Sequence, residues 1–148
     1  HSTSLLLPDA RIINGGAKQS SYQILTPGYL QNGPRPTIAT APSELTLGDE
    51  FDVTSNDASV ITHLNMIRMA STTHAVNYDQ RILKLPFVTH GQTMHCTLGT
   101  NPNVAIPGYY MLFALNAPSR SPRTMSAITR NITDKPIVRT LFFFIGLF

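Results

Sequence analysis

Cysteine occurs only once in this sequence, at Cys96, so the chain cannot form an internal disulfide. That residue lies in the apolar run MHCTLG, which favours a buried, unreactive thiol, because free cysteine is among the most buried residue types. Long hydrophobic runs are missing too. The C-terminal run LFFFIGLF has eight residues, whereas a membrane-spanning helix needs roughly 18 or more. The sequence therefore predicts neither a disulfide scaffold nor a transmembrane helix.

Charged residues are also scarce, at 13% of the chain, which is low for a cytosolic protein. Residues 1–117 carry six Lys or Arg against seven Asp or Glu, a net charge of −1, and residues 118–148 carry five against one, a net charge of +4. The isoelectric point near 9.3 thus reflects a neutral body and a basic C-terminal segment. A nucleic-acid-binding face, which needs basic residues gathered on the folded body, is not predicted.

The length of 148 residues corresponds to one domain, or to one domain plus part of another. Apolar residues make up 42% of the chain, enough for a buried core and too many for a disordered chain. The sequence shows neither an initiator methionine nor a signal peptide. We therefore expect a mature product or a fragment of a longer protein.

The secondary-structure signals are nearly all those of strands. Eleven prolines and nine glycines disfavour long helices. Short apolar runs separated by turn residues recur after residue 34: PTIATAP, EFDVTS, VITHLNMIRM, QRILKLPFV, TMHCTLG and YYMLFALN. Short strands at even spacing are typical of a sandwich of antiparallel sheets. The sequence predicts an all-β fold with this sandwich over residues 35–128.

A separate group of strands is predicted at the N-terminus. The run LLL-PDAR-IINGG indicates a hairpin closed by a Pro-Asp turn, and SYQILTP indicates a strand that ends at Pro27. A hairpin and one strand cannot bury an apolar face unaided. The missing neighbours must come from a longer parent chain, from another subunit or from the sandwich itself. We expect a chain trimmed to about residues 33–128 to behave better in solution.

One histidine, His74, lies in the polar stretch TTHAVNYDQR. A lone histidine in a polar loop is normally just solvated or hydrogen-bonded, so composition alone does not predict a metal site there. His63, His90 and His95 have no distinctive sequence context either, and His63 lies in a predicted sandwich strand.

Several motifs in order resemble the C-terminal part of the galactose oxidase and glyoxal oxidase family of secreted copper radical oxidases: HSTSLLLPD, YQILTPGYL, GPRPTI, TTHAVNYDQR and IPGYYMLFALN-x-PS. The resemblance covers residue 1 to about residue 119. It implies that residues 1–27 are the last strands of an incomplete β-propeller blade and that residues 28–34 are a linker. It also implies that residues 35–128 form an immunoglobulin-like sandwich and leaves residues 129–148 as a tail of unknown structure.

By residue-for-residue correspondence, the resemblance implies that His1 and His74 are copper ligands. Imidazole suits copper(II), which favours nitrogen and oxygen donors. A ligand imidazole usually gives its second N–H to an oxygen acceptor. The neighbouring Asn77, Asp79 and Gln80 are expected to supply that acceptor or to orient the loop. Arg81 is expected to brace the turn by pairing with Asp79 or with a backbone carbonyl.

The chain also departs from the family pattern. The tyrosine and cysteine that form the family's radical cofactor lie upstream of the segment that this chain resembles, so the resemblance places no catalytic residue here. Ala10 stands where the family's hairpin turn usually has glycine. Residues 131–133, Asn-Ile-Thr, form a glycosylation sequon that matters only if the chain is secreted.

The resemblance therefore implies the C-terminal fragment of a secreted oxidase, inactive alone, whose partner is the remainder of a β-propeller oxidase. The whole enzyme would bind copper and oxidise a small primary alcohol or aldehyde with O2, giving H2O2. One alternative is a non-catalytic sandwich module for binding or assembly, since fold does not fix function. Another is a histidine-brace copper protein, in which the α-amine and imidazole of His1 chelate copper together with His74.

Overall fold

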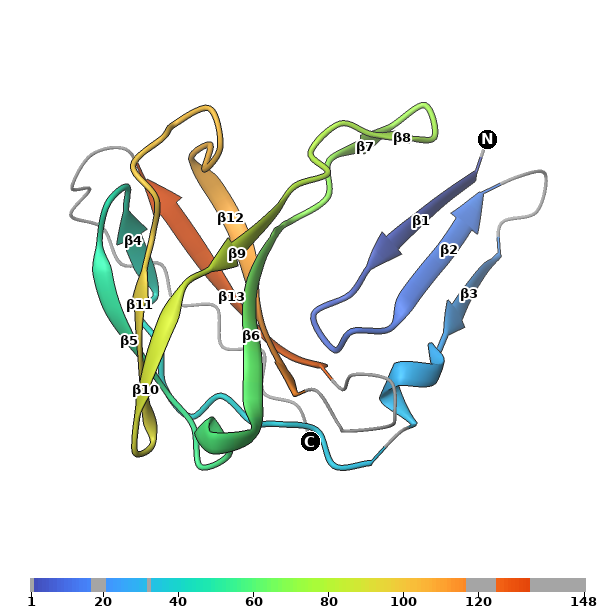
Figure 1. Cartoon of the computed structure of the whole chain (residues 1–148). Coiled ribbons are helices and arrows are strands. Elements are labelled where there is room, and N and C mark those ends of the chain that lie inside the picture. Colours follow the sequence, from blue (N-terminus) through green and yellow to red (C-terminus); the bar gives the residue numbers. More distant parts are fainter. Residues whose placement is uncertain (1, 17–20, 32, 117–124, 134–148) are drawn as a thin grey trace.

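The computed structural model describes residues 2–16, 21–31, 33–116 and 125–133, and the last range is described by its backbone alone (Figure 1). Apart from two short 3-10 helices, η1 (Gly28–Leu30) and η2 (Ala58–Val60), all regular elements in these ranges are strands. The prediction of an all-β fold is confirmed. No helix in the described ranges is long and apolar enough to cross a membrane.

Two sheets face each other and form the sandwich (Figure 1). The larger sheet has the strand order β4 (Glu44–Thr46), β13 (Met125–Thr133), β12 (Gly108–Asn116), β6 (Ile61–Arg68) and β9 (Ile82–Leu85). The smaller sheet has the order β10 (Phe87–His90), β11 (Thr93–Thr97) and β5 (Glu50–Thr54). Neighbouring strands are antiparallel except for β13 and β4, which are parallel.

The core lies between the two sheets and follows from alternating side chains. In β5, Phe51 and Val53 are buried, and in β11, Met94 and Cys96 are buried. The Cys96 thiol donates to the Met94 carbonyl over 3.4 Å, and burial raises its pKa to about 12. The prediction of a buried, unreactive thiol is confirmed, because the nucleophilic thiolate form is suppressed at neutral pH.

Strand β12 is buried on both faces, whereas a sandwich strand normally has one face in the core and the other in solvent. Its even-numbered residues Tyr110, Leu112 and Ala114 join the sandwich core. Its odd-numbered residues Met111, Phe113 and Leu115 face the other way and form a second apolar cluster. The cluster also contains Ile67 of β6 and four residues from the N-terminal region: Leu6, Ala10, Tyr29 and Leu30. The continuous apolar run YYMLFALN is the sequence signature of this two-sided burial.

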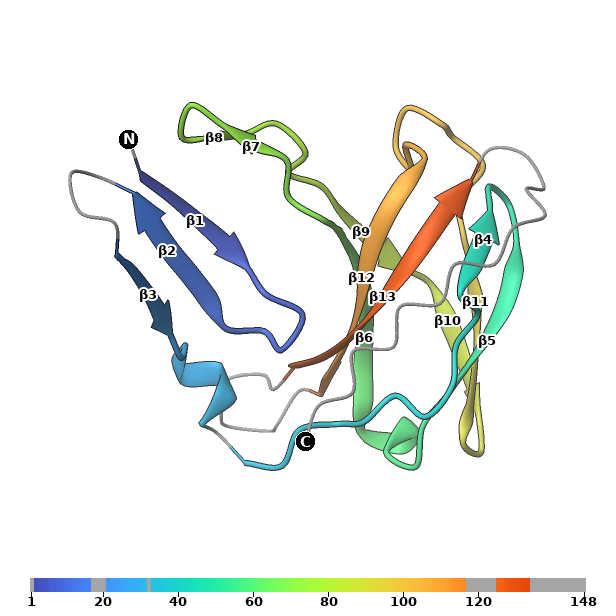
Figure 2. The same cartoon turned by 180° about the vertical axis from the view of Figure 1, so that it is seen from behind.

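The N-terminal sheet meets this outer face at one end (Figure 2), where Leu6 and Ala10, together with Tyr29 and Leu30 of η1, pack against it. This sheet has the strand order β1 (Ser2–Leu6), β2 (Ile12–Gly16) and β3 (Tyr22–Leu25), with antiparallel neighbours. The sequence left three possible sources for the apolar neighbours of these strands. The sandwich itself supplies some of these neighbours.

The turn between β1 and β2 explains how alanine replaces glycine at position 10. Ala10 N donates to Leu7 O over 2.9 Å, and Leu7 N donates to Arg11 O over 2.8 Å. This is a type I turn followed by a bulge residue with positive φ, a position that favours glycine. Ala10 adopts a φ of 68° and is fully buried in the second cluster, while its carbonyl accepts a 2.7 Å hydrogen bond from the Tyr29 hydroxyl. The methyl group is therefore used for packing against the sandwich.

The described part of the C-terminal region extends β13 beyond residue 128. The strand pairs with β12 from Met125 to Ile132 and with β4 from Asn131 to Thr133. Residues 134–148 lie outside the described ranges, as do residues 117–124.

Candidate metal centre

His74 lies at the tip of a small hairpin that projects from the sandwich between β6 and β9 (Figure 1). Strands β7 (Thr72–Thr73) and β8 (Val76–Asn77) pair antiparallel, so His74 and Ala75 form a two-residue turn. Both have positive φ, 52° and 67°, as a type I′ turn requires, and Asn-Gly is the pair that fits this turn best. A non-glycine residue in this region costs about 1–2 kcal/mol. Backbone strain at an exposed residue indicates a function for its side chain.

The imidazole of His74 is positioned by its neighbour. Its Nδ1 lies 2.8 Å from the Thr73 hydroxyl oxygen. Within the described ranges nothing else hydrogen-bonds the ring, and the residue is exposed. An imidazole with one nitrogen held by a hydroxyl group and the other open to solvent suits a metal ligand. Thr73 takes the place at Nδ1 that was expected for Asn77, Asp79 or Gln80.

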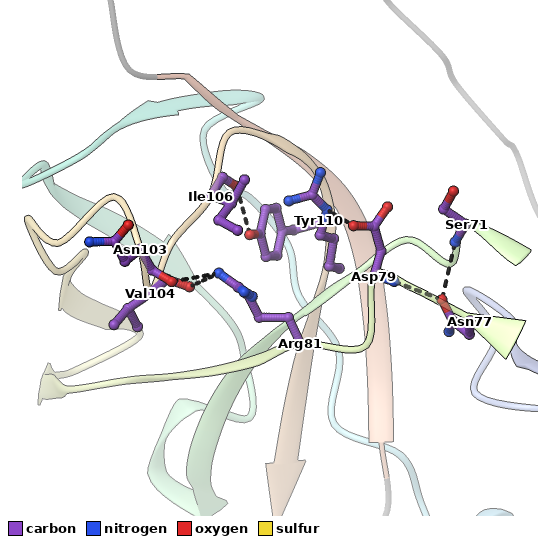
Figure 3. Close-up of polar contacts among 9 residues, drawn as sticks. Ser71, Asn77, Asp79, Arg81, Asn103, Val104, Ile106 and Tyr110 are labelled. Atoms are coloured by element: carbon purple, nitrogen blue, oxygen red, sulfur yellow. Dashed lines mark hydrogen bonds and ion pairs between the residues drawn. The ribbon is translucent and has the colours of Figure 1, made fainter.

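Asn77 closes the hairpin rather than contacting the imidazole. Its side-chain oxygen accepts one hydrogen bond from Ser71 N over 3.2 Å and another from Asp79 N over 3.1 Å (Figure 3). Tyr78 N donates to Ser71 O over 3.1 Å. These bonds fix the ends of β7 and β8 relative to each other, so Asn77 orients the loop.

Arg81 braces the hairpin through backbone carbonyls. Its Nη1 donates to the carbonyl oxygens of Asn103 and Val104, each over 2.9 Å (Figure 3). Asp79 pairs instead with Arg68, with 3.4 Å between Arg68 Nε and Asp79 Oδ1. Gln80 is exposed and forms no hydrogen bond with the described residues.

Sequence reasoning missed Arg68 and its neighbours. The Arg68 Cζ lies 6.0 Å from the centre of the Tyr110 ring, and the Tyr110 hydroxyl donates to Ile106 O over 2.7 Å. Burial raises the pKa of Tyr110, and this effect outweighs the opposing effect of the charges of Arg68 and Arg81. The available signal was an arginine at the end of the otherwise apolar run VITHLNMIRM.

His1 lies outside the described residues. Its neighbour Ser2 begins β1, and both views place the start of β1 and the tip of the β7–β8 hairpin at the same end of the molecule (Figures 1 and 2). The structure thus brings His74, Asn77, Asp79 and Arg81 together at one hairpin. Their association with His1 remains a prediction.

The other histidines lie elsewhere. His63 is half-buried in β6, with Nδ1 at 2.9 Å from the Thr62 hydroxyl oxygen. His95 Nδ1 lies 2.5 Å from Asp52 Oδ1 on the outer face of the small sheet, and the His90 ring centre is 5.4 Å from that of His95. Within the described ranges no three His, Cys, Asp or Glu side chains form a group that could hold a metal ion. His74 therefore fits a copper site as a single nitrogen donor, and a site that includes it would need its other donors from outside these ranges.

Comparisons with known proteins identify relatives of the sandwich and of the chain as a whole. Residues 35–125 match the family described as "Galactose oxidase-like, Early set domain". The chain is 37% identical to a galactose oxidase of Gibberella zeae, with 79% of this chain and 19% of that protein covered. It is 28% identical to aldehyde oxidase GLOX of Vitis pseudoreticulata, with 78% of this chain and 27% of that protein covered.

A solved structure is also similar. A fungal alcohol oxidase in complex with copper superposes with a TM-score of 0.74 at 30% identity, covering 89% of this chain and 30% of that one. The chain therefore spans about a fifth to a third of the length of these relatives. Because the family match covers more than half of the chain, this protein belongs to the galactose oxidase-like Early set domain family.

Proposed function

We propose that this chain is the C-terminal part of a secreted copper radical oxidase and that it supplies two copper ligands, His74 and His1. The observation that carries the proposal is the exposed imidazole of His74 in a turn where it adopts a positive φ of 52°. Its relatives support the proposal, since they include a galactose oxidase and an alcohol oxidase solved with copper.

Exposed apolar side chains around the hairpin support a covering partner. Val76 and Tyr78 are 48% and 70% exposed, and Met69 and Ile82 at the hairpin base are also exposed. A group of such residues on a projecting element is typical of a surface that another domain covers. We propose that the remainder of a β-propeller oxidase covers this hairpin and contributes the other metal donors.

When bound, copper would supply the redox chemistry by which the whole enzyme oxidises a primary alcohol or an aldehyde with O2 and releases H2O2. The part of this chain in that chemistry is to present a neutral imidazole. Thr73 holds the ring through Nδ1, which leaves Nε2 for the metal. The radical-forming residues would come from the rest of the enzyme, so we expect the chain to be inactive alone.

A copper(II) titration followed by EPR spectroscopy tests the proposal on the chain itself. The expected result is one tetragonal copper(II) signal that is lost in His74→Ala and in His1→Ala. His63→Ala is the matched control, because its ring is also held by a threonine hydroxyl but lies in a sandwich strand. The double variant His90→Ala/His95→Ala removes the exposed histidine pair, which is the obvious site of adventitious binding.

Binding that persists in both His74→Ala and His1→Ala would contradict the assignment of these ligands. Absence of binding by the chain alone would favour the second function considered, a non-catalytic sandwich module. Binding that depends on His1 and is abolished by acetylation of its α-amine would favour the histidine-brace arrangement.

A further inference from the structure

We propose that Arg68 is a positioning residue for His74, which fixes the direction of the β7–β8 hairpin through its contact with Asp79. The inference rests on the proposed function of His74 as a copper ligand. It concerns a residue on a sandwich strand, outside the stretch TTHAVNYDQR that carries the ligand.

The Arg68 side chain is anchored on the sandwich. It is only 17% exposed. Its guanidinium group lies near the ring of fully buried Tyr110, whose hydroxyl is fixed by Ile106 O. Gly108 is also close, because an added Cβ there would come within 3.1 Å of Arg68 Nη2 and 3.3 Å of Cζ. A long side chain confined in this way loses most of its freedom and can hold a partner at a defined place.

The contact with Asp79 carries this position into the hairpin. Asp79 Oδ1 lies 3.4 Å from Arg68 Nε, and Asp79 N donates to the side chain of Asn77, the last residue of β8. Asn77 in turn accepts from Ser71 N, just before β7. One line of contacts therefore runs from the core residue Tyr110 through Arg68 to Asp79. From Asp79 it continues through Asn77 to Ser71 at the base of the hairpin (Figure 3).

Backbone bonds also hold the residues at the base of the hairpin. Arg68 N donates to Arg81 O over 3.0 Å, and Met69 N donates to Tyr109 O over 2.9 Å. These bonds do not depend on the Arg68 side chain. A two-stranded ribbon is only marginally stable by itself, and the positive φ at its tip needs support from its surroundings. The side-chain contact therefore controls where the tip points, while the backbone bonds maintain the fold.

A measurement without metal tests whether the Arg68 side chain controls the direction of the hairpin independently of the backbone bonds. A nitroxide spin label is attached to Val76→Cys on the hairpin, or to Val88→Cys on β10 as the control position; both parent residues are exposed. Buried Cys96, whose pKa is raised to about 12, stays unlabelled at neutral pH. Label mobility is read from the room-temperature EPR line shape.

We expect Arg68→Met and Asp79→Asn each to shorten the rotational correlation time of the label at position 76 about twofold, and to leave the label at position 88 unchanged. The double variant should do no more than either single variant, because both remove the same contact. Arg68→Lys should restore part of the order. Arg11→Met is the matched control, since Arg11 pairs with Asp9 over 2.6 Å in the other hairpin, and it should have no effect at position 76.

The affinity for copper(II) tests whether Arg68 also affects metal binding by His74. Loss of a residue that orients a ligand typically weakens metal binding by about 10–100-fold, so Arg68→Met should weaken copper(II) binding about tenfold, whereas the control Arg11→Met should leave it unchanged. An unchanged label at position 76 in both Arg68→Met and Asp79→Asn would overturn the inference about Arg68. Copper binding indifferent to His74→Ala would overturn the proposed function instead, so the two failures are distinguishable.

Discussion

The turn residues His74 and Ala75 contribute differently to the hairpin. Both have positive φ, but only the imidazole of His74 forms a side-chain hydrogen bond, with Thr73, while the methyl group of Ala75 is exposed. Replacing Ala75 with glycine should stabilise the turn by about 1 kcal/mol, because glycine adopts positive φ without steric cost. The amide of Tyr78, bonded to Ser71 O, should then exchange roughly fivefold more slowly with solvent.

The matched control for Ala75→Gly is Ala70→Gly, an exposed alanine before the hairpin for which no positive φ is found. That variant should not raise the protection of the Tyr78 amide. Faster exchange in Ala75→Gly would show that the turn does not store the strain that its φ values indicate.

Replacing Ala10 with glycine has two opposing effects of similar size on the free energy of unfolding. Ala10→Gly removes a buried methyl group, which costs about 0.8 kcal/mol, but relieves the positive φ of 68°, which is worth about 1–2 kcal/mol. The free energy of unfolding should therefore change by less than about 1.5 kcal/mol. Ala10→Val should lower it by more than about 2 kcal/mol, because a branched side chain must fit a fully buried site with positive φ. Urea denaturation of the two variants checks the difference, and equal losses would contradict the account of this turn.

At the scale of elements, the β1–β2 hairpin depends on the ionised form of Asp9. Burial raises the pKa of this carboxyl, but hydrogen bonds from Arg11 and the charges of Arg11 and Arg35 outweigh burial and lower it below 3.8. A lowered folded-state pKa adds stability that is present above pH 3.8 and is lost as the pH falls through the folded-state value.

Asp9→Asn should accordingly lower the melting temperature more at pH 6 than at pH 2.5. Asp49→Asn is the control for a turn aspartate, since Asp49 accepts a hydrogen bond from Thr46 N but pairs with no arginine among the described residues. A penalty for Asp9→Asn that is the same at both pH values would show that charge at Asp9 does not hold the turn.

The strands of the sandwich could be predicted because alternation and turn residues are local signals. The region around His74 shows the limit of such signals. Asn77 bonds to residues nearby in the sequence, whereas Arg68 and Asp79 meet only because β6 and the hairpin exit are adjacent in space. The prediction that His74 is a metal ligand came from the family resemblance, since composition did not distinguish His74 from other loop histidines.

At the scale of the whole molecule, the sandwich and the N-terminal sheet depend on each other. The sequence led us to expect better solution behaviour from a chain trimmed to about residues 33–128. The structure gives the opposite expectation, because the end of β1, the β1–β2 turn and η1 pack against Met111, Phe113 and Leu115 on the outer face of β12. Their exposure would leave an apolar patch on the large sheet.

A chain that starts at residue 33 should therefore self-associate more than the full chain, as measured by light scattering across a range of concentrations. The same chain with Met111→Thr and Phe113→Thr on β12 is the control, and it should lose much of that association. A trimmed chain that stays monomeric without these changes would contradict the packing of the N-terminal sheet on the sandwich.

The central claim is that His74 and His1 bind one copper ion. The most direct test is electron spin-echo envelope modulation of the copper(II)-loaded chain, which counts coordinated imidazoles through their remote nitrogens. The account predicts two coordinated imidazoles in the parent chain, and it predicts that this two-imidazole copper(II) species is lost in either His74→Ala or His1→Ala. An unchanged count in His74→Ala would contradict the account, because copper would then be held at other residues.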